Sequence, residues 1–179
     1  GNIITMHQKG WMVNGSDFID QLDYTYQPNS NKLQRVWDFK NEYQSKLGDF
    51  KFDPAVKTSG NDYSYDVNGN MTSDVNKKIS SITYNHLNLP MVISTDKGTI
   101  IFTYDAGGNK LKKVVAETGK APKTTLYIGG AVYEDDVLQF LGHEEGRIRW
   151  KGETGTFEWD YFLKDHLGNV RMVLTEEVK

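Results

Sequence analysis

The most informative feature of the sequence is an alternation of hydrophobic and polar residues with a period of two. It runs through residues 19–26 and returns at residues 63–65 and 157–161, with Gly-, Asn- and Asp-rich segments in between. Successive side chains of a β-strand point to opposite faces of a sheet, so this period is typical of half-buried strands. No long stretch keeps an uninterrupted helical apolar period. The pattern predicts an all-β fold in which consecutive antiparallel hairpins form a twisted, open sheet.

A turn motif separates the predicted strands, and residues 102–111 show it in its fullest form, Phe-Thr-Tyr-Asp-Ala-Gly-Gly-Asn-Lys-Leu. Asp105 can accept hydrogen bonds from backbone N–H groups two residues further on, and Gly108 can take the positive φ that a tight reversal needs. We expect a β-hairpin in which Tyr104 and Leu111 are partners on one face.

The motif recurs at regular intervals. Residues 65–70 and 84–89 resemble residues 104–109, and their first tyrosines lie 19 and 20 residues apart. Residues 165–169 keep Asp, Gly and Asn at the same offsets. Gly1-Asn2-Ile3 reads as the end of another such turn. About 20 residues accommodate two strands and two turns, so each repeat is expected to be one hairpin.

This spacing divides the chain into four segments. We predict degenerate hairpins of the same type over residues 1–37, an irregular or partly helical insertion over 38–60, regular repeats over 61–115 and looser hairpins over 116–179. Within the insertion, Phe39, Tyr43 and Leu47 lie at helical spacing.

Composition restricts the classes of partner. The formal net charge is −3 with acids and bases interspersed, so we expect no binding of nucleic acid. No apolar run is long enough for a transmembrane helix, so we predict no membrane span. The sequence has no cysteine, which removes thiolate catalysis and cysteine metal sites.

Candidate chemistry is sparse. Asp66, Asn68 and Asn70 alternate as calcium ligands do, but no glutamate follows at the required distance, so a turn explains them better. The four histidines, His7, His86, His143 and His166, lack the spacing of a metal site. We therefore predict no metal, no cofactor, no catalytic residue and no enzymatic activity.

Three groups of aromatic residues at period two are open to two interpretations. They are Tyr24 and Tyr26, Tyr63 and Tyr65, and Phe157, Trp159 and Tyr161. The favoured interpretation is that each group packs into the interior or against a second layer. The alternative is an exposed aromatic ladder that binds carbohydrate or a partner protein, with Trp159, Tyr161 and Phe157 as its candidate binding residues.

Residues 65–70 and 104–111 resemble the YD repeats of the Rhs family. Residues 161–171, Tyr-Phe-Leu-Lys-Asp-His-Leu-Gly-Asn-Val-Arg, resemble the start of the Rhs-repeat-associated core in a form common in Bacteroidetes proteins. In that family, long arrays of such hairpins form a β-sheet shell around a C-terminal payload, often a toxin.

The resemblance implies a scaffold segment of a larger exported bacterial protein, secreted or at the cell surface. Its partners would be the rest of its own polypeptide and the payload, with a glycan or cell-surface partner as the alternative. Because an isolated array leaves sheet edges unpaired, we also expect edge-to-edge self-association.

Overall fold

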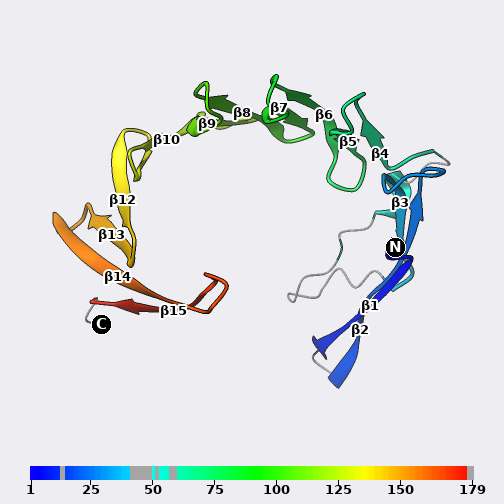
Figure 1. Ribbon diagram of the computed structural model, residues 1–179, viewed down its shortest axis with the longest axis horizontal. Coiled ribbons are helices and arrows are strands. Elements are labelled where there is room, and N and C mark those ends of the chain that lie inside the picture. Colours follow the sequence, from blue (N-terminus) through cyan, green and yellow to red (C-terminus); the bar gives the residue numbers. More distant parts are fainter. Residues whose placement is uncertain (13–14, 41–49, 51–52, 57–59, 177–179) are drawn as a thin grey trace. The chain divides into compact units, whose positions relative to one another are not determined.

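The computed structural model describes residues 1–12, 15–40, 50, 53–56 and 60–176, and it confirms the all-β class (Figure 1). Consecutive antiparallel hairpins follow one another in an open sheet. The one helical element among the described residues is a 3-10 turn at Pro54–Val56. Tyr43 and Leu47, which suggested a helix in the insertion, lie outside the described residues. No helix in the described ranges is long and apolar enough to cross a membrane.

The chain divides into two compact units, Gly1–Lys97 and Gly98–Lys179. In the first unit, a three-stranded antiparallel sheet is followed by four further strands, each paired with the next along the chain. The three strands are β1 (Thr5–Met12), β2 (Gly15–Tyr26) and β3 (Leu33–Asp38), and the four are β4 (Tyr63–Tyr65), β5 (Met71–Asp74), β6 (Ile79–Tyr84) and β7 (Pro90–Thr95).

The second unit is a meander in which each strand pairs antiparallel with the next. Its strands are β8 (Gly98–Tyr104), β9 (Lys110–Glu117), β10 (Lys123–Ile128), β11 (Ala131–Glu134), β12 (Val137–His143), β13 (Gly146–Lys151), β14 (Thr156–Lys164) and β15 (Val170–Thr175).

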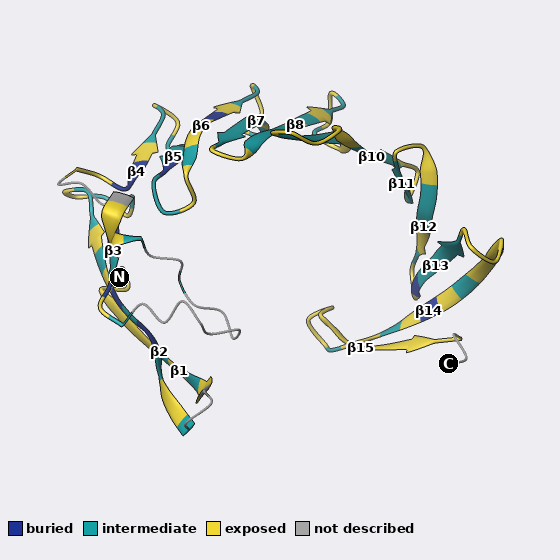
Figure 2. Ribbon diagram, turned by 180° about the vertical axis from the view of Figure 1, so that it is seen from behind, coloured by how far each residue is buried: buried dark blue, intermediate teal, exposed yellow. Residues whose placement is uncertain are grey.

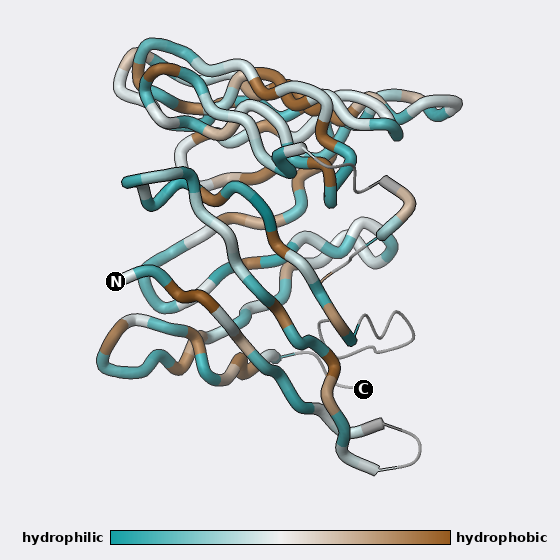
Figure 3. The backbone as a smooth tube through the Cα atoms, turned by 90° about the vertical axis from the view of Figure 1, so that its right-hand side faces the viewer, coloured by the Kyte–Doolittle hydropathy of each residue, from teal (hydrophilic) through white to brown (hydrophobic). Residues whose placement is uncertain are grey.

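The hydrophobic core of the first unit joins its two groups of strands. Leu22 of β2, Val36 of β3 and Tyr63 of β4 are buried against one another, and Phe50 packs at the side of this cluster. Apolar and polar residues alternate along the strands rather than forming long apolar runs (Figure 3). The buried cluster lies between strands of different hairpins.

Several aspartates are buried. The carboxylates of two of them in the first unit accept hydrogen bonds from backbone N–H groups. Asp62 accepts the backbone N–H of Val36 at 3.1 Å, and Asp20 accepts that of Phe50 at 2.8 Å. A buried polar group without a partner is costly, so these bonds are required for the aspartates to lie inside. They fix how the hairpins of the first unit pack.

A β-bulge directly follows the turn in each of the hairpins β2–β3, β4–β5, β6–β7, β8–β9 and β14–β15, and it corrects one expectation. Tyr104 pairs with Lys110 and Thr103 pairs with Lys112, so Leu111 is the extra residue of the bulge and does not face Tyr104. A bulge inserts one unpaired residue and increases the local twist. The extra residues in the five hairpins are Gln34, Thr72, Met91, Leu111 and Arg171.

Candidate functional site

The repeated turn is held by one aspartate carboxylate. In the hairpin of β8 and β9, Asp105 Oδ1 accepts the backbone N–H groups of Gly107 at 2.9 Å and Asn109 at 2.8 Å. Its Oδ2 accepts the side-chain amide of Asn109 at 2.8 Å. The backbone closes the turn from Asp105 N–H to the Asn109 carbonyl, at 3.0 Å. Both carboxylate oxygens are thus engaged within the turn.

The same arrangement recurs at three other positions. Asp66 and Asp165 each accept the N–H groups two and four residues further on, together with the amide of the Asn at the fourth. Asn85 makes the two backbone contacts through its amide oxygen, to Leu87 at 2.9 Å and Leu89 at 3.0 Å. The turn therefore requires a side-chain acceptor at its first position, not a charge.

The hydrogen bonds lower the pKa of each turn aspartate. For Asp66, Asp105 and Asp165 the main cause is the side-chain amide of the Asn four residues further on, and backbone N–H groups add to it. A carboxylate that accepts several hydrogen bonds in its charged form is favoured in that form. These residues are therefore ionised and committed to turn structure.

The fourth residue of each turn lies in the left-handed region. Gly69, Gly108 and Gly168 have φ of 90°, 85° and 82°, and Asn88 takes the same place with φ of 59°. Glycine reaches this region without steric cost, and asparagine tolerates it. This explains why the motif has glycine at this position and why asparagine, as Asn88, can replace it in one turn.

Tyrosine hydroxyl groups connect successive hairpins. Tyr84 Oη donates to the carbonyl of Met71 at 2.6 Å, and Tyr65 Oη donates to the carbonyl of Leu33 at 2.9 Å. Each acceptor is the residue paired with the tyrosine of the preceding hairpin. The tyrosine of the motif thus binds the neighbouring repeat rather than its own turn.

The N-terminal residues repeat this contact. Tyr26 Oη donates to the carbonyl of Ile3 at 2.8 Å, and the amide of Asn2 donates to the carbonyl of Ser30 in the following turn at 3.3 Å. The amide of Asn70 likewise reaches the following turn, at Asn88, at 2.8 Å. Gly1-Asn2-Ile3 therefore makes contacts that resemble those at the end of a turn, as their sequence suggested.

The aromatic groups at period two have different fates. Tyr63 is buried in the core of the first unit, with Tyr24 and Tyr65 packed beside it, as the favoured interpretation expected. On β14, in contrast, Phe157, Trp159 and Tyr161 remain 56%, 38% and 40% exposed. The strand is coloured mainly as exposed or intermediate (Figure 2). Within the second unit, the described strands leave these three side chains partly exposed.

The exposed strip has local order. The rings of Trp159 and Tyr161 are nearly parallel, at 13°, with centroids 6.3 Å apart. His143 of β12 approaches both rings edge-on, at 5.5 and 6.3 Å. The ring centroids of Trp150 on β13 and of Phe157 lie 4.9 Å apart. Neighbouring strands thus hold the three candidate side chains in one aromatic surface, which we call the aromatic strip.

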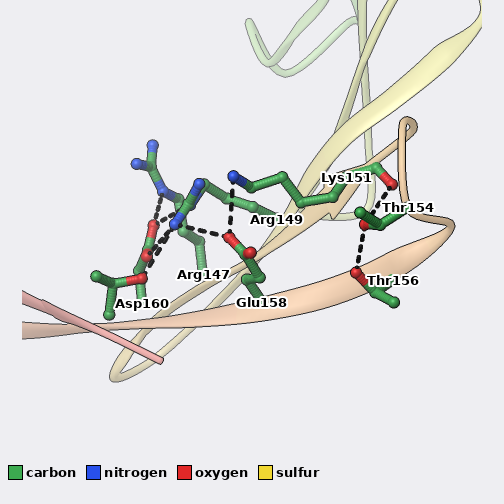
Figure 4. A network of polar contacts seen from close by, with 8 residues as sticks. Arg147, Arg149, Lys151, Thr154, Thr156, Glu158 and Asp160 are labelled. Carbon is green, nitrogen blue, oxygen red and sulfur yellow. Dashed lines mark hydrogen bonds and ion pairs between the residues drawn. The ribbon is translucent and has the colours of Figure 1, made fainter. Parts of the chain in front are cut away.

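The opposite face of the same strands carries an ion-pair network (Figure 4). Asp160 is 1% exposed and accepts hydrogen bonds from Arg149 Nε at 2.7 Å and Arg147 Nε at 2.8 Å. The Arg149 guanidinium, ahead of that of Arg147, holds the pKa of Asp160 down to about 2 against the opposing effect of burial. The network fixes β13 against β14 and keeps the strip on the other face.

A cavity of about 480 Å³ lies beside this network, with Phe140, Arg147 and Trp150 among its lining residues. Arg147 stacks on Phe140, its guanidinium carbon 5.6 Å from the ring centroid. The basic groups here are paired with Asp160 and Glu158. The lining of the cavity therefore carries both basic and acidic side chains.

The residues that were considered as metal ligands make structural contacts. His7 packs against Phe18, and His143 belongs to the aromatic strip. In the described ranges, no three His, Asp or Glu side chains gather where they could hold a metal ion. Asp66 and Asn70 bond to each other, and Asn68 bonds to Asn88 of the next turn.

Sequence reasoning found the turns but missed two sets of contacts. The hydroxyl bonds of Tyr65 and Tyr84 depend on how one hairpin lies beside the next, which no local pattern specifies. The Arg147, Arg149 and Asp160 cluster had a partial signal, since Arg147 and Arg149 alternate along one strand and an acidic residue follows on the next. Pairing the two strands in register was needed to find it.

Neither the protein families nor the curated proteins with which the sequence was compared match this chain.

Proposed function

We propose that this chain is a non-catalytic scaffold segment of a larger exported protein of the Rhs/YD-repeat type. In this proposal, its hairpins form part of a β-sheet wall that encloses or presents a C-terminal payload such as a toxin. Its partners are the rest of its own polypeptide and that payload. The proposed location is outside the bacterial cytoplasm, secreted or at the cell surface.

The observation that carries the proposal is the coupling between consecutive hairpins. One turn geometry, with Asp66, Asn85, Asp105 or Asp165 at its head, generates these hairpins. The hydroxyl groups of Tyr65 and Tyr84 then bind the preceding repeat. In an array where each repeat contacts its neighbours, stability accumulates along the chain and an extended wall can form.

The motifs support the same proposal. The residues that resemble the YD repeat have structural contacts: Tyr65 donates to the neighbouring hairpin, and the aspartate, glycine and asparagine of residues 66–70 and 105–109 build the turns. The side chains of the motif therefore serve to build the sheet. The proposal assigns no catalytic residue to the chain.

The proposal can be tested on the polypeptide that is encoded by the whole reading frame containing this sequence. The proposal predicts further Asp-Gly-Asn hairpins outside these residues and a dissimilar segment that resists protease while the wall is folded. Removing the turn acceptors Asp66 and Asp105 together should make that segment cleavable. A frame with no further hairpins, or a segment cleaved equally in both forms, would overturn the proposal.

The aromatic strip supports a second candidate, a surface that binds carbohydrate or a partner protein. Aromatic side chains dominate binding energy at such surfaces, and here Phe157, Trp159 and Tyr161 are exposed together. The ordered rings of Trp159 and Tyr161 offer a fixed apolar surface for a sugar ring.

A glycan array tests this candidate with the 179-residue chain. Retention of a glycan that is lost in Trp159→Ala would support it. The matched control is Trp11→Ala, because Trp11 is 76% exposed on β1 of the other unit. If the wild-type chain retains no glycan, or if both variants lose retention equally, the strip does not bind carbohydrate.

A further inference from the structure

The cavity beside the ion-pair network belongs to strands β11, β12 and β13 of the second unit. Val132 of β11 pairs with Phe140 of β12, and Phe140 pairs in turn with Arg149 of β13. Cross-strand partners share a face of an antiparallel sheet, and so does Arg147, two residues before Arg149. The volume of about 480 Å³ lies within the range of roughly 300–1,000 Å³ that small-molecule sites occupy.

Two contacts orient Arg147 at this cavity. Its Nε donates to Asp160 Oδ2 at 2.8 Å, and its guanidinium carbon lies 5.6 Å from the ring centroid of Phe140. Among the described residues, neither terminal nitrogen of Arg147 has a hydrogen-bond partner. These two nitrogens point away from the network (Figure 4). Because the side chain is already ordered, it loses less conformational entropy when it binds a ligand.

The network of β13 and β14 carries an excess of positive charge. Three cations alternate along β13, namely Arg147, Arg149 and Lys151. They pair with two carboxylates of β14, those of Glu158 and Asp160, and both arginines share Asp160. A ligand with one negative charge would therefore balance the network, and Arg147 is the cation whose terminal donors are available to bind it.

The polar groups of the cavity match a ligand that has both a carboxylate and hydroxyl groups. The terminal nitrogens of a guanidinium form a planar fork of donors that fits the two oxygens of a carboxylate. Gln139, which also lines the cavity, donates its amide to the carbonyl of Val137 at 3.1 Å, and its Oε1 has no partner in the described part of the chain. Glu134 adds a second acceptor, paired through Oε2 with Lys123 at 2.7 Å. Acceptors in these positions require donors on the ligand, such as hydroxyl groups.

We propose that this cavity binds an acidic sugar, a ring with one carboxylate and several hydroxyl groups, such as a uronic acid residue. Arg147 binds the carboxylate through its terminal nitrogens, Gln139 accepts a hydrogen bond from a hydroxyl group, and Phe140 supplies an apolar contact for the C–H groups of the ring. An acidic peptide side chain would supply the carboxylate but no hydroxyl donor for Gln139, so the contacts favour the sugar. The inference goes beyond the scaffold proposal and does not depend on it or on the aromatic strip.

The first experiment titrates the isotope-labelled 179-residue chain with glucuronate and follows its NMR spectrum. We expect saturable shifts in the signals of Arg147 and Gln139. Glucose is the matched control ligand, because it replaces the carboxylate with a hydroxymethyl group, and it should bind about tenfold more weakly or not at all. N-acetylglutamate α-amide, which has a carboxylate but no hydroxyl group, should also bind more weakly than glucuronate.

The second experiment repeats the titration with variants whose fold is checked by circular dichroism. Arg147→Lys keeps the charge but loses the planar fork, so glucuronate should bind about tenfold more weakly. The matched control is Arg171→Lys in the same unit, because Arg171 binds Asp165 of its own turn through Nη2 at 2.7 Å and Nε at 2.8 Å. Gln139→Leu leaves the ion-pair network intact, so it tests the site even if Arg147→Lys does not fold. It should weaken the binding of glucuronate and leave that of N-acetylglutamate α-amide unchanged.

Several results would overturn the proposal. These are a wild-type chain that shows no saturable shifts with glucuronate, equal affinities for glucuronate and glucose, and equal losses in Arg147→Lys and Arg171→Lys, which would indicate diffuse attraction by positive charge. Tighter binding of N-acetylglutamate α-amide than of glucuronate would assign the cavity to an acidic peptide instead. Shifts confined to Trp159 and Tyr161 would place the sugar on the aromatic strip rather than in the cavity.

Discussion

Tyr84 donates its hydroxyl hydrogen bond to the carbonyl of Met71, with 2.6 Å between the oxygens. Met71 is the residue that pairs with Tyr65, the tyrosine of the preceding hairpin. The contact therefore passes from one repeat to the next, and Tyr65 makes it in turn to Leu33. It explains why a tyrosine precedes the turn, where a phenylalanine would supply the same ring but no donor.

The first prediction concerns this hydroxyl. Tyr84→Phe should lower the free energy of unfolding by about 1 kcal/mol, because the Met71 carbonyl loses a neutral hydrogen bond while the packing of the ring is kept. Urea denaturation followed by circular dichroism measures it. The control is Tyr161→Phe, since the Tyr161 side chain is exposed on the aromatic strip. An equal effect of the two variants would contradict the role of the hydroxyl.

The second prediction separates acceptor from charge at the head of the turn. Asp105→Ala removes the acceptor for the N–H groups of Gly107 and Asn109, and it should lower Tm by roughly 2–4 °C. Asp105→Asn should retain most of the stability, because Asn85 makes the corresponding contacts in its own turn. Thermal unfolding of both variants checks this, and an Asn variant as unstable as the Ala variant would show that the charge is required.

The third prediction concerns the left-handed position. Gly108 has φ of 85°, so Gly108→Val should destabilise the chain by about 1–2 kcal/mol. Gly108→Asn should cost less, because Asn88 occupies the same position in the neighbouring turn with φ of 59°. Chemical denaturation of the two variants gives the comparison. No difference between Val and Asn would mean that the backbone at Gly108 is not left-handed.

The sequence was sufficient for features that depend on a few adjacent residues. The period of two predicted the strands, and the Asp, Gly and Asn of residues 105–109 predicted the turn, because the carboxylate meets N–H groups only two and four residues away. The expected pairing of Tyr104 with Leu111 was wrong because a β-bulge follows the turn and makes Leu111 its extra residue.

The fate of the aromatic groups could not be read from their spacing. Tyr63 and Trp159 share the same period, yet Tyr63 is 9% exposed and Trp159 is 38% exposed. Tyr63 lies where β4 packs on Leu22 and Val36, whereas within its own unit β14 contacts only the neighbouring strands β13 and β15 among the described elements. Burial depends on which elements meet, and that information is distributed over the chain.

The last prediction concerns acid stability and Asp160. Its pKa is lowered to about 2, mainly by Arg149, from an ordinary value of 3.8, so ionised Asp160 stabilises the fold above about pH 4 and this contribution is lost as the pH falls through about 2. Asp160→Asn should therefore lower the free energy of unfolding by about 2 kcal/mol at neutral pH. The difference from wild type should shrink between pH 4 and pH 2. Tryptophan fluorescence reports on this region through Trp150 and Trp159.

Glu117→Gln is the control, because its exposed pair with Lys120 contributes little. A deficit in Asp160→Asn that stays constant down to pH 2 would contradict the role of the ionised carboxylate and leave packing of the side chain as the cause.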